Sequence, residues 1–168
     1  MSENNEKRTP FINDWMFALV MRDPDICKGL LELVLSKDDI GEVKIATPDH
    51  PIFDENIEID VTTQASLKFV EDMHGIRFDA YIKTQKCWAE IEMQIARSES
   101  LGKRARYYRC SMDYDCLEEG DDYEKLQTTY VIFLCTFDYE GKDKPIYFFR
   151  NWDVKNHLPL NDFEYTIL

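Results

Sequence analysis

Two segments of alternating polarity, separated by two residues, constrain the fold of this chain more than any other feature of its sequence. In GIRFDAYIKT, at residues 75–84, every second residue from Ile76 to Ile82 is apolar, and in the segment that begins AEIEMQI at residue 89, Ala, Ile and Met alternate with Glu and Gln. Such alternation is typical of strands with one buried face. The link Gln85-Lys86 is so short that we expect an antiparallel hairpin in which Thr84 pairs with Cys87.

This register places several polar side chains on one face of the hairpin. It sets Asp79 opposite Glu92, Tyr81 opposite Glu90, and Arg77 opposite Gln94. Directly opposed side chains begin ~5 Å apart, and two carboxylates at that separation repel each other. A hard divalent cation with oxygen ligands would relieve the repulsion. The alternative interpretation is a solvated face on which Arg77 and Lys83 neutralise the acids.

Helices are expected on both sides of the hairpin. Asn13 is a suitable N-cap for a short first helix, and Asp23-Pro24 begins a second helix that ends near Leu35. The apolar residues expected to face the core are Ile12, Trp15, Met16, Leu19 and Val20 in the first helix, and Ile26, Leu30, Leu33 and Val34 in the second. A third helix begins after Ser98 or Ser100 and runs to about Leu117, with an inward stripe of Leu101, Ala105, Tyr108 and Met112.

The apolar run TTYVIFLCTF, at residues 128–137, predicts a buried strand. Together with the hairpin and the third helix it predicts a right-handed crossover between parallel strands. We also expect strands at 43–46 (VKIA) and 145–150 (PIYFFR). Because the chain ends in the apolar alternation FEYTIL, we expect a single domain at residues 11–168 that continues beyond Leu168, preceded by a disordered lead-in at residues 1–10.

The charge distribution narrows the function classes. The formal net charge of −13 over 168 residues argues against a protein that coats nucleic acid by charge alone. It does not exclude an enzyme whose acidic site recruits Mg²⁺. No apolar run approaches the length of a membrane span, and the polar first ten residues do not resemble a signal peptide, which indicates a cytoplasmic protein with no membrane partner. The positive charge is clustered, since Lys103, Arg104, Arg106 and Arg109 fall within seven residues.

The order of these elements resembles the PD-(D/E)XK nuclease superfamily, and more narrowly its transposase-associated, recombination-promoting branch. The matching pieces follow the family order from residue 13 to residue 150: NDWMF, RFDAYI, EIEMQ, KRARYY, YEKLQTTYVIFL and PIYFFR. The resemblance implies an α/β fold with a restriction-endonuclease-like core, in which a mixed central β-sheet is flanked by α-helices.

The resemblance also implies metal-dependent hydrolysis of a phosphodiester in double-stranded DNA, linked to transposition or recombination of mobile elements. Asp79 and Glu92 would be the principal Mg²⁺ ligands, with Mn²⁺ as a substitute ion. The Met93 carbonyl and Glu90 would be further metal ligands, and Arg104 and Tyr108 would bind DNA or support the site. Gln94 stands where most of the superfamily has Lys, and it is neutral and cannot act as a base. The resemblance thus implies a catalytic set of Asp79, Glu92 and Gln94, in which Gln94 can orient water by hydrogen bonds.

Two other classes of protein remain open on the sequence. One is a domain that keeps the nuclease fold, is catalytically weak or inactive, and binds DNA or a protein partner. Gln94 and the net charge of −13 favour this class, whereas the presence of both Asp79 and Glu92 favours the enzyme. The other is an acidic structural domain that shares only the architecture of nucleases. The sequence also leaves open whether the protein forms a homodimer.

Overall fold

The computed structural model describes residues 10–35, 60–63, 66–67, 76–85, 87–160, 162 and 164–168. The strand predicted at 43–46 lies outside these residues. The helices are α1 (Asp14–Val20), α2 (Pro24–Leu35), α3 (Leu101–Cys116) and the 3₁₀ helix η1 (Tyr123–Lys125). The strands are β1 (Asp60–Thr63), β2 (Ser66–Leu67), β3 (Ile76–Arg77), β4 (Ala80–Lys83), β5 (Cys87–Gln94), β6 (Thr128–Cys135), β7 (Phe148–Phe149) and β8 (Glu164–Ile167).

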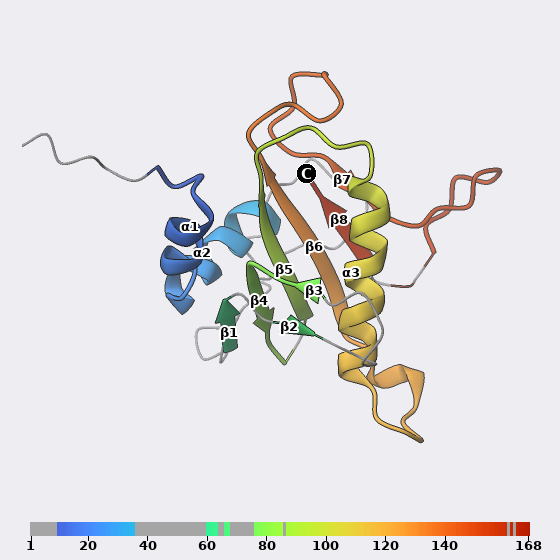
Figure 1. Cartoon of the computed structure of the whole chain (residues 1–168). Helices are drawn as coiled ribbons and strands as arrows, with labels where there is room; N and C mark the ends of the chain where they lie inside the picture. The colour runs from blue at the N-terminus through green and yellow to red at the C-terminus, as the bar shows by residue number, and fades with distance from the viewer. Residues whose placement is uncertain are drawn as a thin grey trace, which may run out of the picture.

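Six of the strands form one mixed sheet in the order β1-β4-β5-β6-β8-β7 (Figure 1). The central part of the sheet is parallel, since β5 pairs with β6 and β6 with β8 in the same direction. The other pairs, β1 with β4, β4 with β5, and β7 with β8, are antiparallel. The parallel pairing of β5 and β6 confirms the expectation drawn from the helix between them. Strands β2 and β3 form a separate two-stranded sheet.

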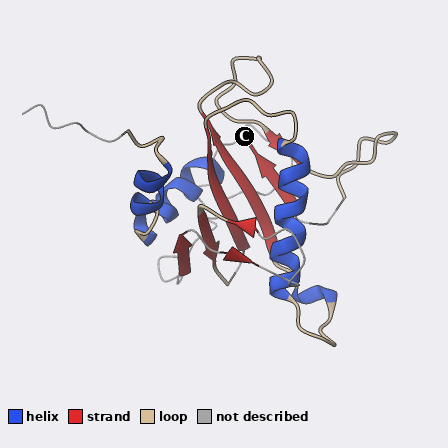
Figure 2. Ribbon diagram, in the orientation of Figure 1, coloured by secondary structure: helices blue, strands red, loops and turns tan. Residues whose placement is uncertain are grey.

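Helices cover both faces of the sheet (Figure 2). One face packs against α1 and α2 through a buried cluster that includes Phe17, Leu31, Ile82, Ile91 and Ile132. The opposite face packs against α3 through a second cluster that includes Phe78, Tyr81, Leu101, Met112 and Phe133. The α/β architecture with a mixed sheet between helices is therefore confirmed. None of the described helices is long and apolar enough to cross a membrane.

The predicted hairpin register is confirmed along β4 and β5. Tyr81 pairs with Glu90, and the two-residue link is closed by hydrogen bonds between Thr84 and Cys87, including Thr84 N to Cys87 O at 3.0 Å. The single long strand predicted at residues 75–84 is wrong, because the chain bends at Asp79. Arg77 therefore pairs with Ser66 and does not lie opposite Gln94 as predicted.

The helix boundaries follow the predicted caps. The Asn13 side chain accepts hydrogen bonds from two backbone N–H groups of α1, and α2 begins at Pro24 after Asp23. The predicted inward faces are partly right: Val34 is buried and Leu30 packs against the core as predicted, whereas none of the residues predicted for α1 is buried. The side chains of Trp15 and Leu33 are 63% and 59% exposed, whereas the buried residues are Phe17, Ala18 and Met21 in α1 and Cys27, Leu31, Val34 and Leu35 in α2. Apolar residues lie on most sides of the short helix α1, so its sequence period does not select one face, whereas the buried residues of α2 follow the i, i+4, i+7 spacing of a single helical face.

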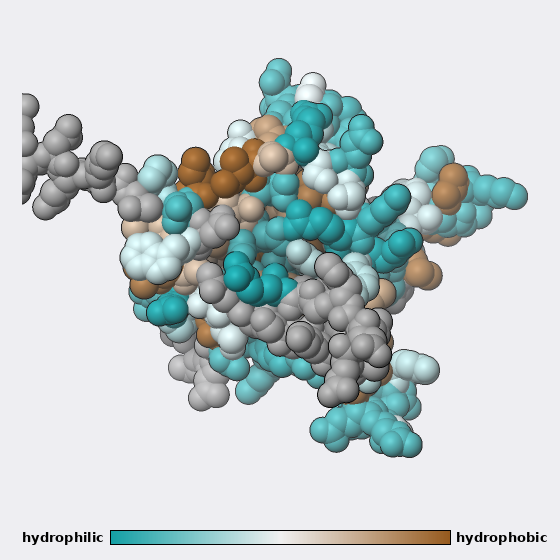
Figure 3. Space-filling view, in the orientation of Figure 1, coloured by the Kyte–Doolittle hydropathy of each residue, from teal (hydrophilic) through white to brown (hydrophobic). Residues whose placement is uncertain are grey.

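The third helix matches its prediction more closely. It begins after Ser100, whose side chain makes no capping hydrogen bond, and Leu101, Ala105 and Met112 are buried. Part of the surface stays apolar: Phe11, Trp15, Leu19 and Ile95 are exposed, and Figure 3 shows hydrophobic residues gathered near α1 and the upper end of β5. Hydrophilic residues dominate the α3 side of the same view.

Candidate functional site

The polar face of β5 is covered by α3 and is not solvated. Alternation along the strand sends Ala89 and Ile91 into the cluster under α1 and α2, which leaves Glu90, Glu92 and Gln94 facing α3. Glu90 is 0% exposed and Gln94 is 8% exposed. The interpretation as a solvated face is therefore wrong for this strand. Its expected neutralising residue, Lys83, pairs with Asp115 on α3 at 2.7 Å.

Asp79 reaches the same region from the bend before β4. Its Oδ2 accepts a hydrogen bond from the backbone N–H of Met93 at 3.4 Å, which ties the carboxylate to β5. Because the chain bends at Asp79, the paired part of β4 begins at Ala80, which lies opposite Ile91. The predicted pair Asp79–Glu92 is one position beyond this last pair. Burial raises the pKa of both Glu90 and Tyr108, and the negative charge of Asp79 raises both further.

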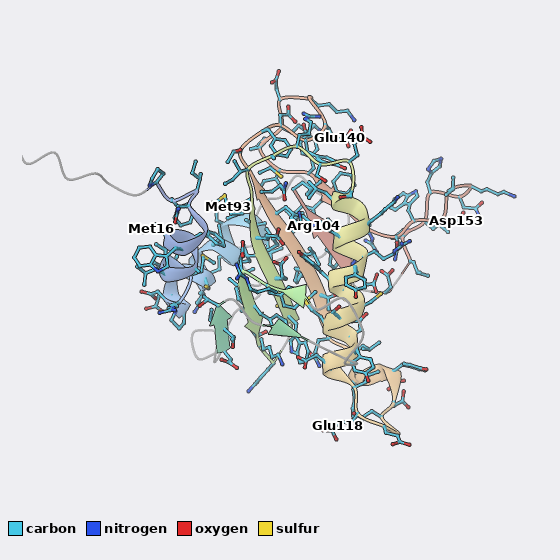
Figure 4. The ribbon with its side chains drawn as sticks, in the orientation of Figure 1. Met16, Met93, Arg104, Glu118, Glu140 and Asp153 are labelled. Atoms are coloured by element: carbon cyan, nitrogen blue, oxygen red, sulfur yellow. The ribbon has the colours of Figure 1, made fainter. Side chains whose placement is uncertain are left out.

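Arg104 on α3 is the cation that enters this acidic region. Its guanidinium forms an ion pair with Glu92 Oε1 and donates hydrogen bonds to Gln94 Oε1 at 2.9 Å and to the Tyr108 hydroxyl at 3.1 Å. It also lies 5.3 Å from the centroid of the Phe133 ring on β6. Figure 4 labels Arg104 on α3 and Met93 on β5, the two elements that frame the site. Residues from β5, β6 and α3 thus meet around one guanidinium.

Glu90 is a carboxylate whose charged form is strongly disfavoured by its surroundings. Neither of its carboxylate oxygens has a hydrogen-bond partner among the described residues. Burial raises the pKa of Glu90 well above its usual value, the charge of Asp79 raises it further, and the charge of Arg104 lowers it. An unpaired buried carboxylate is costly, so this side chain favours either a bound proton or a bound cation.

Tyr108 belongs both to the core and to the site. Its ring packs edge-on against Phe78 at 5.3 Å between centroids and lies 6.3 Å from Phe133. Burial raises the pKa of its hydroxyl, and the hydrogen bond from Arg104 opposes this shift. Arg104 and Tyr108 are one helical turn apart, which is the spacing that brings side chains of a helix into contact.

The donor set fits a hard divalent cation. Both oxygens of Glu90 and Oε2 of Glu92 are buried and unpartnered among the described residues, and carboxylate oxygens are the ligands such ions prefer. No group of three or more His, Cys, Asp or Glu residues in the described part of the chain is arranged to hold a metal ion. The geometry therefore fits two carboxylates completed by backbone and solvent better than a closed cage of carboxylates.

Sequence reasoning missed two components of this site. It did not identify Phe133, which lies inside a long apolar run with nothing to distinguish it from other core residues. It also did not pair Arg104 with Gln94, because contacts between a strand and a helix follow no short sequence spacing. The clustering of basic residues in KRARYY was the available signal for Arg104.

A mixed sheet between helical layers, with acids at the junction of β4 and β5 facing the helix that follows, defines a nuclease fold of the restriction-endonuclease-like α/β class. The family model described as PD-(D/E)XK nuclease family transposase matches residues 11–166, and the chain belongs to this family. The resemblance inferred from the motifs is thereby confirmed. PD-(D/E)XK nucleases generally use divalent metal ions. Comparison with curated proteins and with solved structures finds no match.

Proposed function

We propose that this protein is a metal-dependent endonuclease that hydrolyses phosphodiester bonds of double-stranded DNA during transposition or recombination. The observation that carries the proposal is the pair of acids Glu90 and Glu92 on the face of β5 that α3 covers. Both oxygens of Glu90 and Oε2 of Glu92 are buried without a hydrogen-bond partner among the described residues, and Asp79 is tied to the same strand through the Met93 N–H. Membership in the family supports the link to transposition and DNA as the substrate.

Asp79 and Glu92 would hold the ion, Mg²⁺ or Mn²⁺, together with the Met93 carbonyl. When bound, the ion would polarise the scissile phosphate and lower the pKa of the attacking water. The chain's own residues set the geometry: the Met93 N–H fixes Asp79, and Arg104 fixes one oxygen of Glu92 and leaves Oε2 available. Glu90 lies deeper and would be an outer ligand.

Gln94 is engaged at both ends of its amide. Its Oε1 accepts from Arg104 at 2.9 Å, and its Nε2 donates to the Ala96 carbonyl. The side chain is 8% exposed, so little of it faces solvent. A role for Gln94 in the chemistry would therefore run mainly through the groups that it orients, which include Arg104.

A plasmid-nicking assay with millimolar Mg²⁺ or Mn²⁺ tests this proposal. The wild-type protein should convert supercoiled plasmid to nicked and linear forms, and chelator should stop the reaction. Asp79→Ala and Glu92→Gln should abolish cleavage. Glu119→Gln, in an exposed loop, removes the same charge as Glu92→Gln and should cleave at the wild-type rate. Cleavage that survives in Asp79→Ala would refute the assigned site.

The second candidate is a nuclease-fold domain that binds DNA or a protein partner without cutting. The observation that favours it is the ion pair between Arg104 and Glu92, which occupies an oxygen that a catalytic ion could use. Binding of duplex DNA without cleavage in either metal would support this candidate. Whether the protein forms a homodimer stays a prediction, and analytical ultracentrifugation is the direct measurement.

A further inference from the structure

The site as built needs a positive charge near the substrate. A phosphodiester that enters it meets Asp79, Glu90 and Glu92, and repulsion between these acids and the phosphate would oppose binding. Gln94 is neutral and cannot offset this charge. Lys83, a cation of strand β4, is held by Asp115 and by the Trp88 ring, whose centroid lies 4.4 Å from its Nζ.

Arg104 is placed to supply that charge. Its side chain is 32% exposed, against 13% for its partner Glu92, so the guanidinium bridges the buried acids and the surface. A guanidinium has five N–H donors, of which Glu92, Gln94 and Tyr108 engage three. The remaining donors, on Nε and Nη1, make no hydrogen bond to the described residues, and charged N–H groups donate strong hydrogen bonds to phosphate oxygens.

The orientation of Arg104 is fixed by its surroundings. Its guanidinium lies beside the neighbouring rings of Phe133 and Tyr108, 5.3 Å and 5.5 Å from their centroids, and Gln94 Oε1 accepts a hydrogen bond from it on the strand side. Gln94 is fixed in turn by its hydrogen bond to the Ala96 carbonyl. A long flexible side chain held at this many points loses little further entropy when a ligand binds.

We propose that Arg104 binds the scissile phosphate and that Gln94 is the positioning residue that holds the Arg104 guanidinium in place. The cation thus comes from α3, across the site, while the strand position carries the amide that orients it. This inference rests on the proposed function and names the residue that contacts the phosphate.

The first test measures DNA binding, so that it does not depend on cleavage. The probe is a fluorescein-labelled 20-base-pair duplex with Ca²⁺ in place of Mg²⁺, and the readouts are affinity and its dependence on salt. Arg104→Gln should weaken binding about tenfold and reduce the slope of log K against log salt by about 0.9, the value for one lost phosphate contact. Arg104→Lys should keep the slope.

Two further variants complete the binding test. Lys125→Gln removes one charge at the end of η1, where Lys125 pairs with Asp121, and should change neither readout. Gln94→Met keeps the charge of Arg104 but removes its anchor, so it should lower affinity and leave the slope unchanged. Equal affinity and slope for Arg104→Gln and Lys125→Gln would overturn the inference. Melting curves for each variant report whether it is folded.

The second test separates the inference from the proposed function. In the nicking assay Arg104→Gln should lose about 10²- to 10³-fold in rate, as expected for removal of one group that stabilises transition-state charge. Adding Gln94→Lys to Arg104→Gln should restore part of that loss, whereas a purely structural role for Arg104 predicts no rescue. A wild-type rate in Arg104→Gln would overturn this inference and leave the nuclease proposal standing. A wild-type protein that never cuts would remove the nuclease proposal, and the binding test would still decide whether Arg104 contacts phosphate.

Discussion

Asp113 offers a quantitative test of the electrostatics around α3, because its carboxyl is ionised at a cost. Burial and, to a lesser extent, the nearby Glu164 carboxylate raise the pKa of Asp113 from 3.8 to about 6 against the opposing charge of Arg109. The folded pKa is above the unfolded one. The stabilising contribution of the protonated form is therefore complete below about pH 3.8 and is lost as the pH rises through about 6.

The magnitude follows from the size of this difference. A rise from 3.8 to about 6 corresponds to about 3 kcal/mol at most, and the partial exposure of the side chain reduces this to about 1–2 kcal/mol. Asp113 also lies in the last turn of α3, where a negative charge is unfavourable. Asp113→Asn should therefore raise the free energy of unfolding by about 1–2 kcal/mol at pH 8.

The assay is urea unfolding followed by circular dichroism at several pH values between 4 and 8, with chelator present. The gain from Asp113→Asn should grow from pH 4 to pH 6 and then level off. Asp115→Asn, two residues along the same helix, removes an equal charge but disturbs the 2.7 Å pair with Lys83, so it should give no gain. A gain from Asp113→Asn that is independent of pH would refute the assigned cause, and no gain at pH 8 would refute the burial argument.

Three further predictions concern the site and the core beside it. Mg²⁺ at ten times its dissociation constant should stabilise the wild-type protein by about 1.4 kcal/mol and raise its melting temperature by several degrees, whereas Asp79→Asn and Glu92→Gln should lose this shift. Glu90→Gln should keep part of it, since Glu90 would be an outer ligand, and an unchanged shift in the same titration would exclude Glu90 from the metal shell. Phe133→Ala should lower the free energy of unfolding in urea by about 3–5 kcal/mol because Phe133 is 1% exposed, while Tyr123→Ala, at an 80% exposed position, should change it little.

The hairpin shows how much of the fold the alternation of apolar and polar residues can determine. Alternation with a period of two and a two-residue link are enough to fix which residues pair, because a slip by one would move every apolar side chain to the other face. The same alternation runs unbroken through Asp79, so it could not reveal the bend there. The residues before the bend, Ile76–Arg77, pair with Ser66–Leu67 in a separate sheet, which is a tertiary contact.

The candidate site shows what the sequence pattern could not predict, namely the burial of its acids. The acids of β5 were identified from the sequence as candidate ligands, and their shared face followed from the register. Their burial did not, because Glu and Gln on alternate positions are equally typical of a solvated face. Only the packing of α3 onto the sheet made Glu90 a fully buried carboxylate.

The sequence by itself determined the class of the elements, the caps of α1 and α2, the register of β4 with β5, and the family to which the chain belongs. The tertiary structure decided which face of α1 is buried and which cation pairs with the acids. The alternative interpretation named Arg77 and Lys83 as the cations that neutralise the acids, yet Lys83 pairs with Asp115 and the cation that pairs with Glu92 is Arg104 on α3. The physical reason is that periodicity records which side of an element is apolar, whereas a contact between a strand and a helix depends on how the two are placed in space.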